Sequence, residues 1–316
     1  MQYIENISNT ELKLTESEIK FNVRNTFYSV VLARNVLKIG NDALQRFETT
    51  FKLTESMFKA GSEKVNKLDY LKNKMALEAF RGMISTFSSN YKSAVSALKY
   101  YIGLDQTDEL SIKDSINDYN LDSIKNILKN DSLIENNLTT QNLEKSIKLF
   151  EFKVDESISD YYPSLALVGN FRRWDNSYKY ATFTKQNQNI FTVGIGLKWN
   201  LFSGFRTDGK TEEREAELSQ LKTRKLLFND GLRMKKEKLI NELNESIDKV
   251  ASSREAMLTS IENRELNLKA YQSEMVSVSD FIEAQLFEAI LSSQYEEALF
   301  SQASTIFKIE NLFGDL

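Results

Sequence analysis

The sequence predicts a mainly α-helical protein made of very long antiparallel coiled-coil helices, with one β-hairpin inserted among them. Its 316 residues include only 11 glycines and one proline, so few positions interrupt a helix. Apolar residues recur at helical spacing over long stretches in both halves of the chain. One central stretch instead alternates between apolar and polar or small residues, which is the pattern of a strand.

The first helical stretch carries an apolar residue at every seventh position, which predicts a coiled-coil seam. The seam residues are Val23, Val30, Leu37, Leu44, Phe51 and Phe58. A second apolar stripe runs from Ile240 to Tyr271 at alternating spacings of three and four, and Arg254 and Arg264 interrupt it. We expect residues 206–272 to form one helix about 100 Å long.

The two halves of the chain resemble each other around their turns. In each half an Asp opens a long helical stretch and a Gly closes it 34 positions later: Asp69 and Gly103, then Asp280 and Gly314. An Asp at a helix start caps free backbone N–H groups, and a Gly past the end allows the left-handed residue that terminates many helices. Each half therefore predicts a helix, a tight turn and an antiparallel return helix.

Between the halves the pattern changes twice. Residues 104–132 are rich in Asp and Asn and predict short irregular elements, after which a helix resumes to about Asp160, where Pro163 stops it. Apolar residues then alternate along two runs: Leu165, Leu167, Gly169 and Phe171, then Phe191, Val193, Ile195, Leu197, Trp199 and Leu201. Small or polar residues take the other face of the second run: Thr192, Gly194, Gly196, Lys198 and Asn200. One apolar and one polar face is typical of a strand in a membrane barrel, where aromatic girdles mark the edges of the apolar band.

Composition excludes several classes of function. No His and no Cys occur, which removes thiol and imidazole catalysis, zinc fingers and disulfides. The net charge of −4 predicts no nucleic-acid partner. No motif predicts a metal site, a cofactor or a catalytic residue, so we expect no enzyme activity. The chain also has no secretory signal at residues 1–20 and no apolar run of transmembrane length.

Two motifs resemble a known family. Tyr162-Pro163-Ser164-Leu165-Ala166-Leu167, followed by the run from Val193 to Gly204 that includes Trp199-Asn200-Leu201-Phe202-Ser203-Gly204, resembles the second hairpin of TolC-type outer membrane efflux proteins. The turns at Gly61 to Asp69 and at Val276 to Gln285 are similar to the helix-hairpin tips of that family.

The resemblance implies a TolC-like fold, in which long helices form a periplasmic α-barrel and a β-hairpin joins a transmembrane β-barrel. It implies a homotrimer in outer membrane lipid with a periplasmic extension, in the envelope of a Gram-negative cell. Such a channel is the passive exit duct of a tripartite efflux pump or a type I secretion system. Its partners are a periplasmic adaptor (membrane fusion protein) and an inner-membrane transporter.

The resemblance also divides the chain into segments. We expect a first-repeat helical hairpin at 1–103, an equatorial segment at 104–133, a helix leading to the barrel at 134–160, the transmembrane hairpin at 161–204 and a second-repeat helical hairpin at 205–316. The family has a signal sequence, a first helix and a first strand pair ahead of this region. We therefore expect the chain to be a fragment, or a defective copy, of a longer protein.

The resemblance assigns roles to several residues. Asp280, Glu283 and Asp69 would form acidic rings at a pore constriction at the periplasmic tip, although helix capping explains the two aspartates equally well. Lys198 and Asn200 would line the barrel lumen, and Trp174, Trp199 and Phe202 would belong to the aromatic girdles, with Tyr178 and Tyr180 across the loop.

The sequence departs from the family pattern at four positions. Asn200 replaces a proline and Phe205 a glycine at the bend from strand to helix, and Glu274 and Val276 replace a glycine and a basic residue at the second tip. Two other classes stay open on the residues alone: a soluble coiled-coil scaffold with an incidental hairpin, and a periplasmic adaptor, for which no flanking β-domain is visible.

Overall fold

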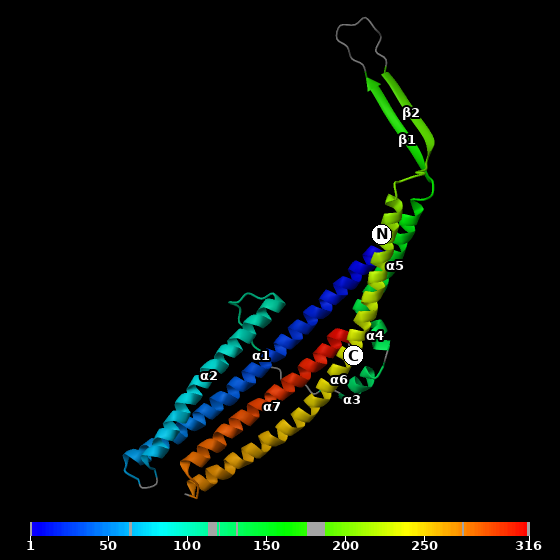
Figure 1. Cartoon of the computed structure of the whole chain (residues 1–316). Coiled ribbons are helices and arrows are strands. Elements are labelled where there is room, and N and C mark those ends of the chain that lie inside the picture. The colour runs from blue at the N-terminus through cyan, green and yellow to red at the C-terminus, as the bar shows by residue number, and fades with distance from the viewer. Residues whose placement is uncertain are drawn as a thin grey trace. The chain divides into compact units, whose positions relative to one another are not determined.

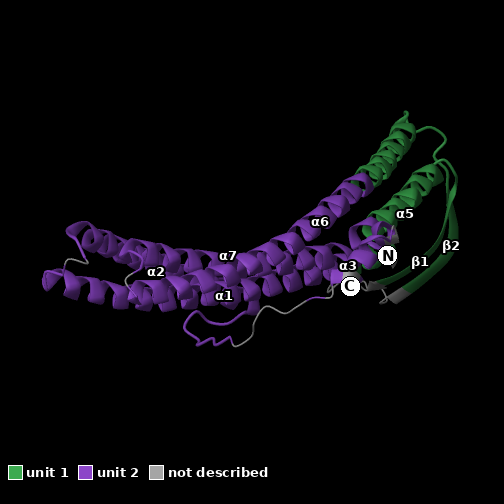
Figure 2. Cartoon of the chain, turned by 90° about the horizontal axis from the view of Figure 1, so that it is seen from below, with its two compact units in different colours: residues 1–9, 141–228 green, residues 10–140, 229–316 purple. Residues whose placement is uncertain are grey.

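The computed structural model describes residues 2–62, 65–112, 119, 121–130, 132–175, 187–273 and 275–314. The chain divides into two compact units, one formed by residues 1–9 and 141–228 and the other by residues 10–140 and 229–316 (Figure 2). Tyr178, Tyr180 and Glu274 lie outside the described residues.

Long helices dominate the structure (Figure 1). The helices are α1 (Gln2–Lys59), α2 (Lys67–Ile102), α3 (Leu121–Leu128), α4 (Ser132–Asn136), α5 (Leu138–Ser159), α6 (Arg206–Gln272) and α7 (Val278–Phe313). Helix α6 has 67 residues and the bounds that the sequence predicts. None of the helices in the described part of the chain combines the length and the apolarity needed to cross a membrane.

The internal repeat is confirmed at the two helical hairpins, α1–α2 and α6–α7. The return helices α2 and α7 have 36 residues each. Both begin with a capping box, in which the N-cap side chain and the Asp three residues later each accept a hydrogen bond from the other's backbone N–H. Helix α2 ends at Gly103, which takes the left-handed conformation with φ 73°, and α7 ends at Gly314 with φ 93°.

In the larger unit, α1 lies between α2 and α7, and the three helices share one core. Of the predicted seam residues only Val30 is fully buried, and the other five are partly buried. The deepest stripe near the tip instead runs through Ala43, Phe47, Thr50 and Thr54. Because α1 packs on two sides, its buried stripe is wider than a two-helix seam and its centre is displaced from the heptad positions.

A second core lies where α3 packs on α6 and α7. Ile124 and Leu128 of α3 meet Leu239 and Leu243 of α6 and Ile306 of α7. The segment that the sequence predicts to be irregular therefore contributes an amphipathic helix to this core. Further on, α4 and α5 are separate helices, because Asn137 breaks the single predicted helix and its Oδ1 accepts from the backbone N–H groups of Thr139 and Thr140.

The smaller unit contains most of α5, the beginning of α6, and the hairpin of β1 (Ser164–Asp175) and β2 (Asn187–Lys198). Ion pairs join the two helices, with Lys225 Nζ 2.6 Å from Glu144 Oε1 and Lys210 Nζ 2.7 Å from Asp160 Oδ2. The strands are antiparallel, and β1 extends to Asp175, beyond the alternation seen in the sequence. Strand β2 ends at Lys198, so Trp199, Asn200 and Leu201 follow the strand instead of belonging to it.

Candidate functional site

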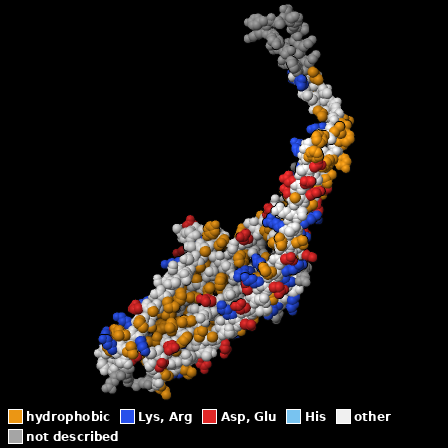
Figure 3. All heavy atoms as spheres, viewed as in Figure 1, with side chains coloured by type: hydrophobic (Ala, Val, Ile, Leu, Met, Phe, Trp, Pro, Cys, Tyr) orange, Lys and Arg blue, Asp and Glu red, His pale blue; other side chains and the backbone are white. Residues whose placement is uncertain are grey.

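The hairpin presents one apolar face that no core covers. The register places Leu165 opposite Leu197, Leu167 opposite Ile195, and Phe171 opposite Phe191. Residues directly opposite each other in an antiparallel pair share a face of the sheet, so the two alternations predicted from sequence lie on the same side. Leu167 is 78% exposed and Ile195 is 80% exposed. Figure 3 shows hydrophobic side chains gathered along the hairpin. A two-stranded ribbon with such a face needs another apolar surface to cover it.

The opposite face of the hairpin is small or polar over most of its length. Ala166 lies opposite Gly196, Asn170 lies opposite Thr192, and Lys198 lies opposite Ser164. Ser164 Oγ also donates to the backbone oxygen of Lys198, at 3.3 Å. Lys198 is thus on the face for which a lumen position is predicted, whereas Asn200 lies past the end of the strand.

Aromatic residues gather where the hairpin meets the helices. Trp199 is 57% exposed, and its indole Nε1–H donates to the backbone oxygen of Tyr161 at 3.2 Å. Phe202 is 74% exposed and its ring meets that of Phe205 edge to face, with centroids 5.8 Å apart. Trp174 belongs to β1, but its side chain lies outside the described part of the structure. The girdle role of these residues stays a prediction.

At the tips, the predicted acidic residues occupy equivalent positions. Asp69 accepts the N–H of Asn66 at 3.4 Å, and Asp280 accepts the N–H of Ser277 at 3.1 Å. Each aspartate therefore stands three residues after the N-cap and completes the capping box, so it is not the N-cap itself. Glu283 follows Asp280 by one helical turn and is exposed. Their role in a pore constriction stays a prediction, and the capping role is present in the structure.

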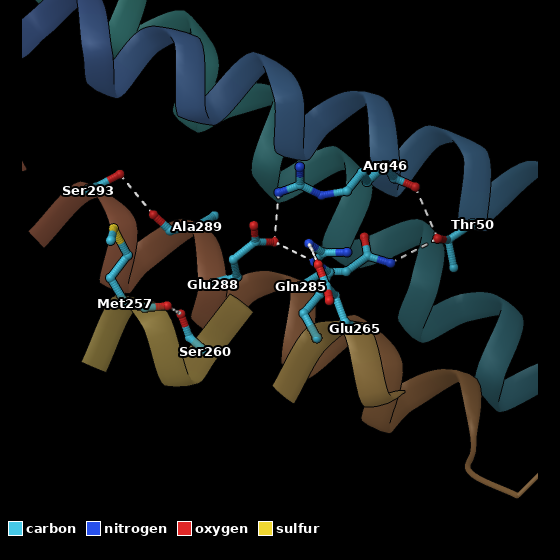
Figure 4. Close-up of polar contacts among 10 residues, drawn as sticks. Arg46, Thr50, Met257, Ser260, Glu265, Gln285, Glu288, Ala289 and Ser293 are labelled. Atoms are coloured by element: carbon cyan, nitrogen blue, oxygen red, sulfur yellow. Dashed lines mark hydrogen bonds and ion pairs between the residues drawn. The ribbon is translucent and has the colours of Figure 1, made fainter. Parts of the chain in front are cut away.

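Sequence reasoning missed a charged cluster above the second tip. Glu288 of α7 is buried and accepts from two arginines on different helices: Arg46 Nη2 of α1 at 2.9 Å and Arg264 Nε of α6 at 3.0 Å (Figure 4). The interruption of the second apolar stripe by Arg264 was a signal for this cluster, since an Arg on a packing face needs a buried partner. Arg254, the other interruption, is exposed.

A ladder of polar side chains continues from this cluster toward the tip. Thr50 Oγ1 accepts from Gln285 Nε2 at 3.0 Å, and Thr54 Oγ1 accepts from Asn73 Nδ2 at 2.8 Å. Thr54, Asn73 and Gln285 are completely buried. These bonds join α1 to α7 and α1 to α2, so the tip end of the larger unit is held by polar contacts as well as by the apolar core. Buried polar bonds demand a specific geometry, which sets the register of the three helices.

No protein-family model matches the sequence, and no curated protein matches it. Solved structures do match the fold. The Campylobacter jejuni CmeC outer membrane channel superposes with a TM-score of 0.82 at 10% identity, over 99% of this chain and 66% of that chain. The outer membrane protein VceC from Vibrio cholerae gives 0.77 at 12% identity, over 98% and 74%.

The open state of the Neisseria gonorrhoeae MtrE outer membrane channel gives a TM-score of 0.79 at 9% identity, over 98% of this chain and 68% of that chain. The chain thus spans about two thirds of the length of CmeC and MtrE. At these identities the likeness establishes the arrangement of the helices and the hairpin. The chain therefore has the fold of the TolC-type outer membrane channels.

Proposed function

We propose that the protein is a subunit of an outer membrane channel, a passive exit duct from periplasm to exterior with no catalytic step. The observation that carries this proposal is the hairpin, whose opposed apolar residues all lie on one exposed face. Lipid covers such a face without a further protein domain, and paired strands from other copies satisfy the backbone groups at both edges of the hairpin. The solved structures that share the fold are described as outer membrane channels, which supports the same reading.

The finer parts of the proposal follow from the fold-level likeness. We infer a homotrimer in which each chain adds its hairpin to a common barrel and its long helices to a periplasmic tunnel. A periplasmic adaptor and an inner-membrane transporter would load the tunnel, as part of an efflux pump or a type I secretion system. The two polar-capped tips, at the ends of the longest helices, are where such partners meet the tunnel in this proposal.

Cell fractionation tests the proposal directly. The protein, tagged at its own chromosomal locus, should sediment with the outer membrane, resist extraction by salt and dissolve only in detergent. A peripheral protein of the inner membrane serves as the control and should be released by salt. Recovery of the tagged protein in the soluble fraction would contradict the channel and favour the coiled-coil scaffold.

A further inference from the structure

The tip end of the larger unit contains a cavity of about 870 Å³. Its walls come from α1, from the end of α6 and from the start of α7, with Val65 and Asp69 contributed by the first tip. This volume is within the range of pockets that hold small organic molecules. Both helical hairpins contribute to the walls, so their relative position shapes the cavity.

One end of the cavity is apolar and aromatic. The rings of Tyr271 and Phe281 stack with centroids 5.3 Å apart and planes 11° apart, and both line the cavity. Leu53, Leu268 and Val278 complete this wall. Such a surface favours a flat aromatic group, which gains from stacking and from removal of apolar area from water.

The polar side chains of the cavity have unused hydrogen-bonding capacity. Six buried side-chain nitrogen or oxygen atoms in the described residues lack a hydrogen-bond partner, and three of them belong to this lining: Arg46 Nε, Tyr271 Oη and Gln285 Oε1. Gln285 is completely buried, and its Nε2 is already committed to Thr50. Native proteins leave few such atoms unpaired, so three at one cavity indicate that a bound molecule supplies their partners.

The unpaired atoms define the head group of that molecule. Arg46 Nε–H is a donor and needs an acceptor, Gln285 Oε1 is an acceptor and needs a donor, and the Tyr271 hydroxyl serves as either. Glu288 already pairs with Arg46 and Arg264, the two cations of the lining, so an additional buried charge would have no counter-ion. An uncharged group with one donor and one acceptor, such as a carboxamide, matches this set.

We propose that this cavity is a binding site for a small uncharged aromatic amide. The apolar body of the ligand contacts the Tyr271–Phe281 stack, its carbonyl accepts from Arg46 Nε, and its N–H donates to Gln285 Oε1. The proposal does not rest on the channel function, because the site lies entirely among helices of one chain and its test measures binding alone.

Protection of an introduced thiol tests this site. The chain has no Cys, so Leu268→Cys places a single reactive group in the cavity wall, and Leu258→Cys, on an exposed part of α6, is the matched control. The probe is naphthamide. At ten times its Kd it should slow modification of the cavity thiol about tenfold, because protection follows one plus the ratio of ligand to Kd. The control thiol should react at an unchanged rate.

Two comparisons make the test specific. Tyr271→Phe, which keeps the stacked ring, and Gln285→Met should each weaken protection about two- to tenfold, as expected for one lost hydrogen bond. Tyr271→Phe keeps the outcome readable if Gln285→Met fails to fold. Methylnaphthalene, which lacks the head group, and naphthoate, which is charged, should protect less than naphthamide. Equal protection by either compound, or no protection by naphthamide up to its solubility limit, would overturn the proposal and leave an apolar or water-filled cavity.

Discussion

At the scale of single residues, Phe205 holds the bend between the hairpin and α6 in an unusual conformation. Its φ is 63°, and it is the only residue other than glycine with a positive φ in the described part of the chain. The family resemblance expects a glycine here, and glycine takes this conformation without strain because it has no Cβ. Phe205 therefore carries a conformational cost at a position where the chain changes direction.

The first prediction concerns that cost. Phe205→Gly should raise the free energy of unfolding by about 1 kcal/mol through relief of the left-handed strain. Urea denaturation of the detergent-solubilised protein, followed by circular dichroism, measures the change. Phe202→Gly removes the other ring of the same aromatic pair without relieving a positive φ, so it should not stabilise. A destabilised Phe205→Gly would show that the ring contact outweighs the strain.

A second residue-scale prediction follows from the pairing of Glu288 with two arginines. Glu288→Gln leaves Arg46 and Arg264 without their shared counter-ion. It should cost about 2 kcal/mol, less than the roughly 3–5 kcal/mol of a fully buried pair, because the Arg46 side chain is 33% exposed. Thermal unfolding of the wild type and the variant provides the measurement.

Glu265 offers the matched control for Glu288. Its carboxylate is 3.6 Å from Arg264 Nη2 and its side chain is 57% exposed, so solvent screens that pair. Glu265→Gln should change stability by less than about 0.5 kcal/mol. Equal effects of the two substitutions would mean that burial of Glu288 contributes nothing.

At the scale of elements, close approach of α1 and α2 depends on a glycine. A Cβ added to Gly40 would lie 2.6 Å from Ile84 Cδ1 and 2.9 Å from Phe87 Cδ2, closer than packed atoms come. Gly82 of α2 has nothing within 4 Å of the same added atom. The two glycines therefore separate helix packing from helix propensity.

The third prediction uses this pair. Gly40→Ala should destabilise the protein by about 1–3 kcal/mol, because overpacking outweighs the better helix propensity of alanine. Gly82→Ala should stabilise it by up to about 1 kcal/mol, because propensity acts alone. The urea midpoints of the two variants decide the matter, and a stabilised Gly40→Ala would show that α1 and α2 separate freely.

The fourth prediction concerns the hairpin, and it compares two substitutions on the same strand. Leu197→Arg puts a charge on the apolar face and should impair membrane assembly, because an arginine facing lipid near mid-depth costs roughly 2–4 kcal/mol. Thr192→Arg, on the small-residue face, should assemble normally. Detergent-extractable protein in the outer membrane fraction is the readout. Equal defects would remove the argument that one face of the hairpin contacts lipid.

At the scale of the whole molecule, the fifth prediction concerns the proposed acidic rings of the trimer. Asp280→Asn with Glu283→Gln should reduce cation preference and weaken block by multivalent cations, since the rings lose their negative charge. Conductance of the channel in planar bilayers measures both effects. Glu262→Gln, an exposed carboxylate on the α6 shaft, is the control and should leave them unchanged. If the double variant conducts like the parent, the two carboxylates serve the helix start alone.

Much of the architecture was present in the sequence because it depends on local patterns. The single helix at 206–272, the 34-residue repeat from Asp69 to Gly103, and the shared face of Leu167 and Ile195 all follow from periodicity and from the residues that start and stop helices. Periodicity states which face of an element is buried. It does not state what lies against that face.

Only the tertiary structure decided the partners. Arg46 and Glu288 are 242 positions apart, and Thr50 and Gln285 are 235 apart, so no local pattern links them. Thr50 and Thr54 look like surface residues on a helix until α2 and α7 pack on both sides of α1 and bury them. The end of β2 at Lys198 likewise depends on where its pairing partner β1 begins, at Ser164. Long-range packing sets these features, and the cavity at the tips exists only because both hairpins meet there.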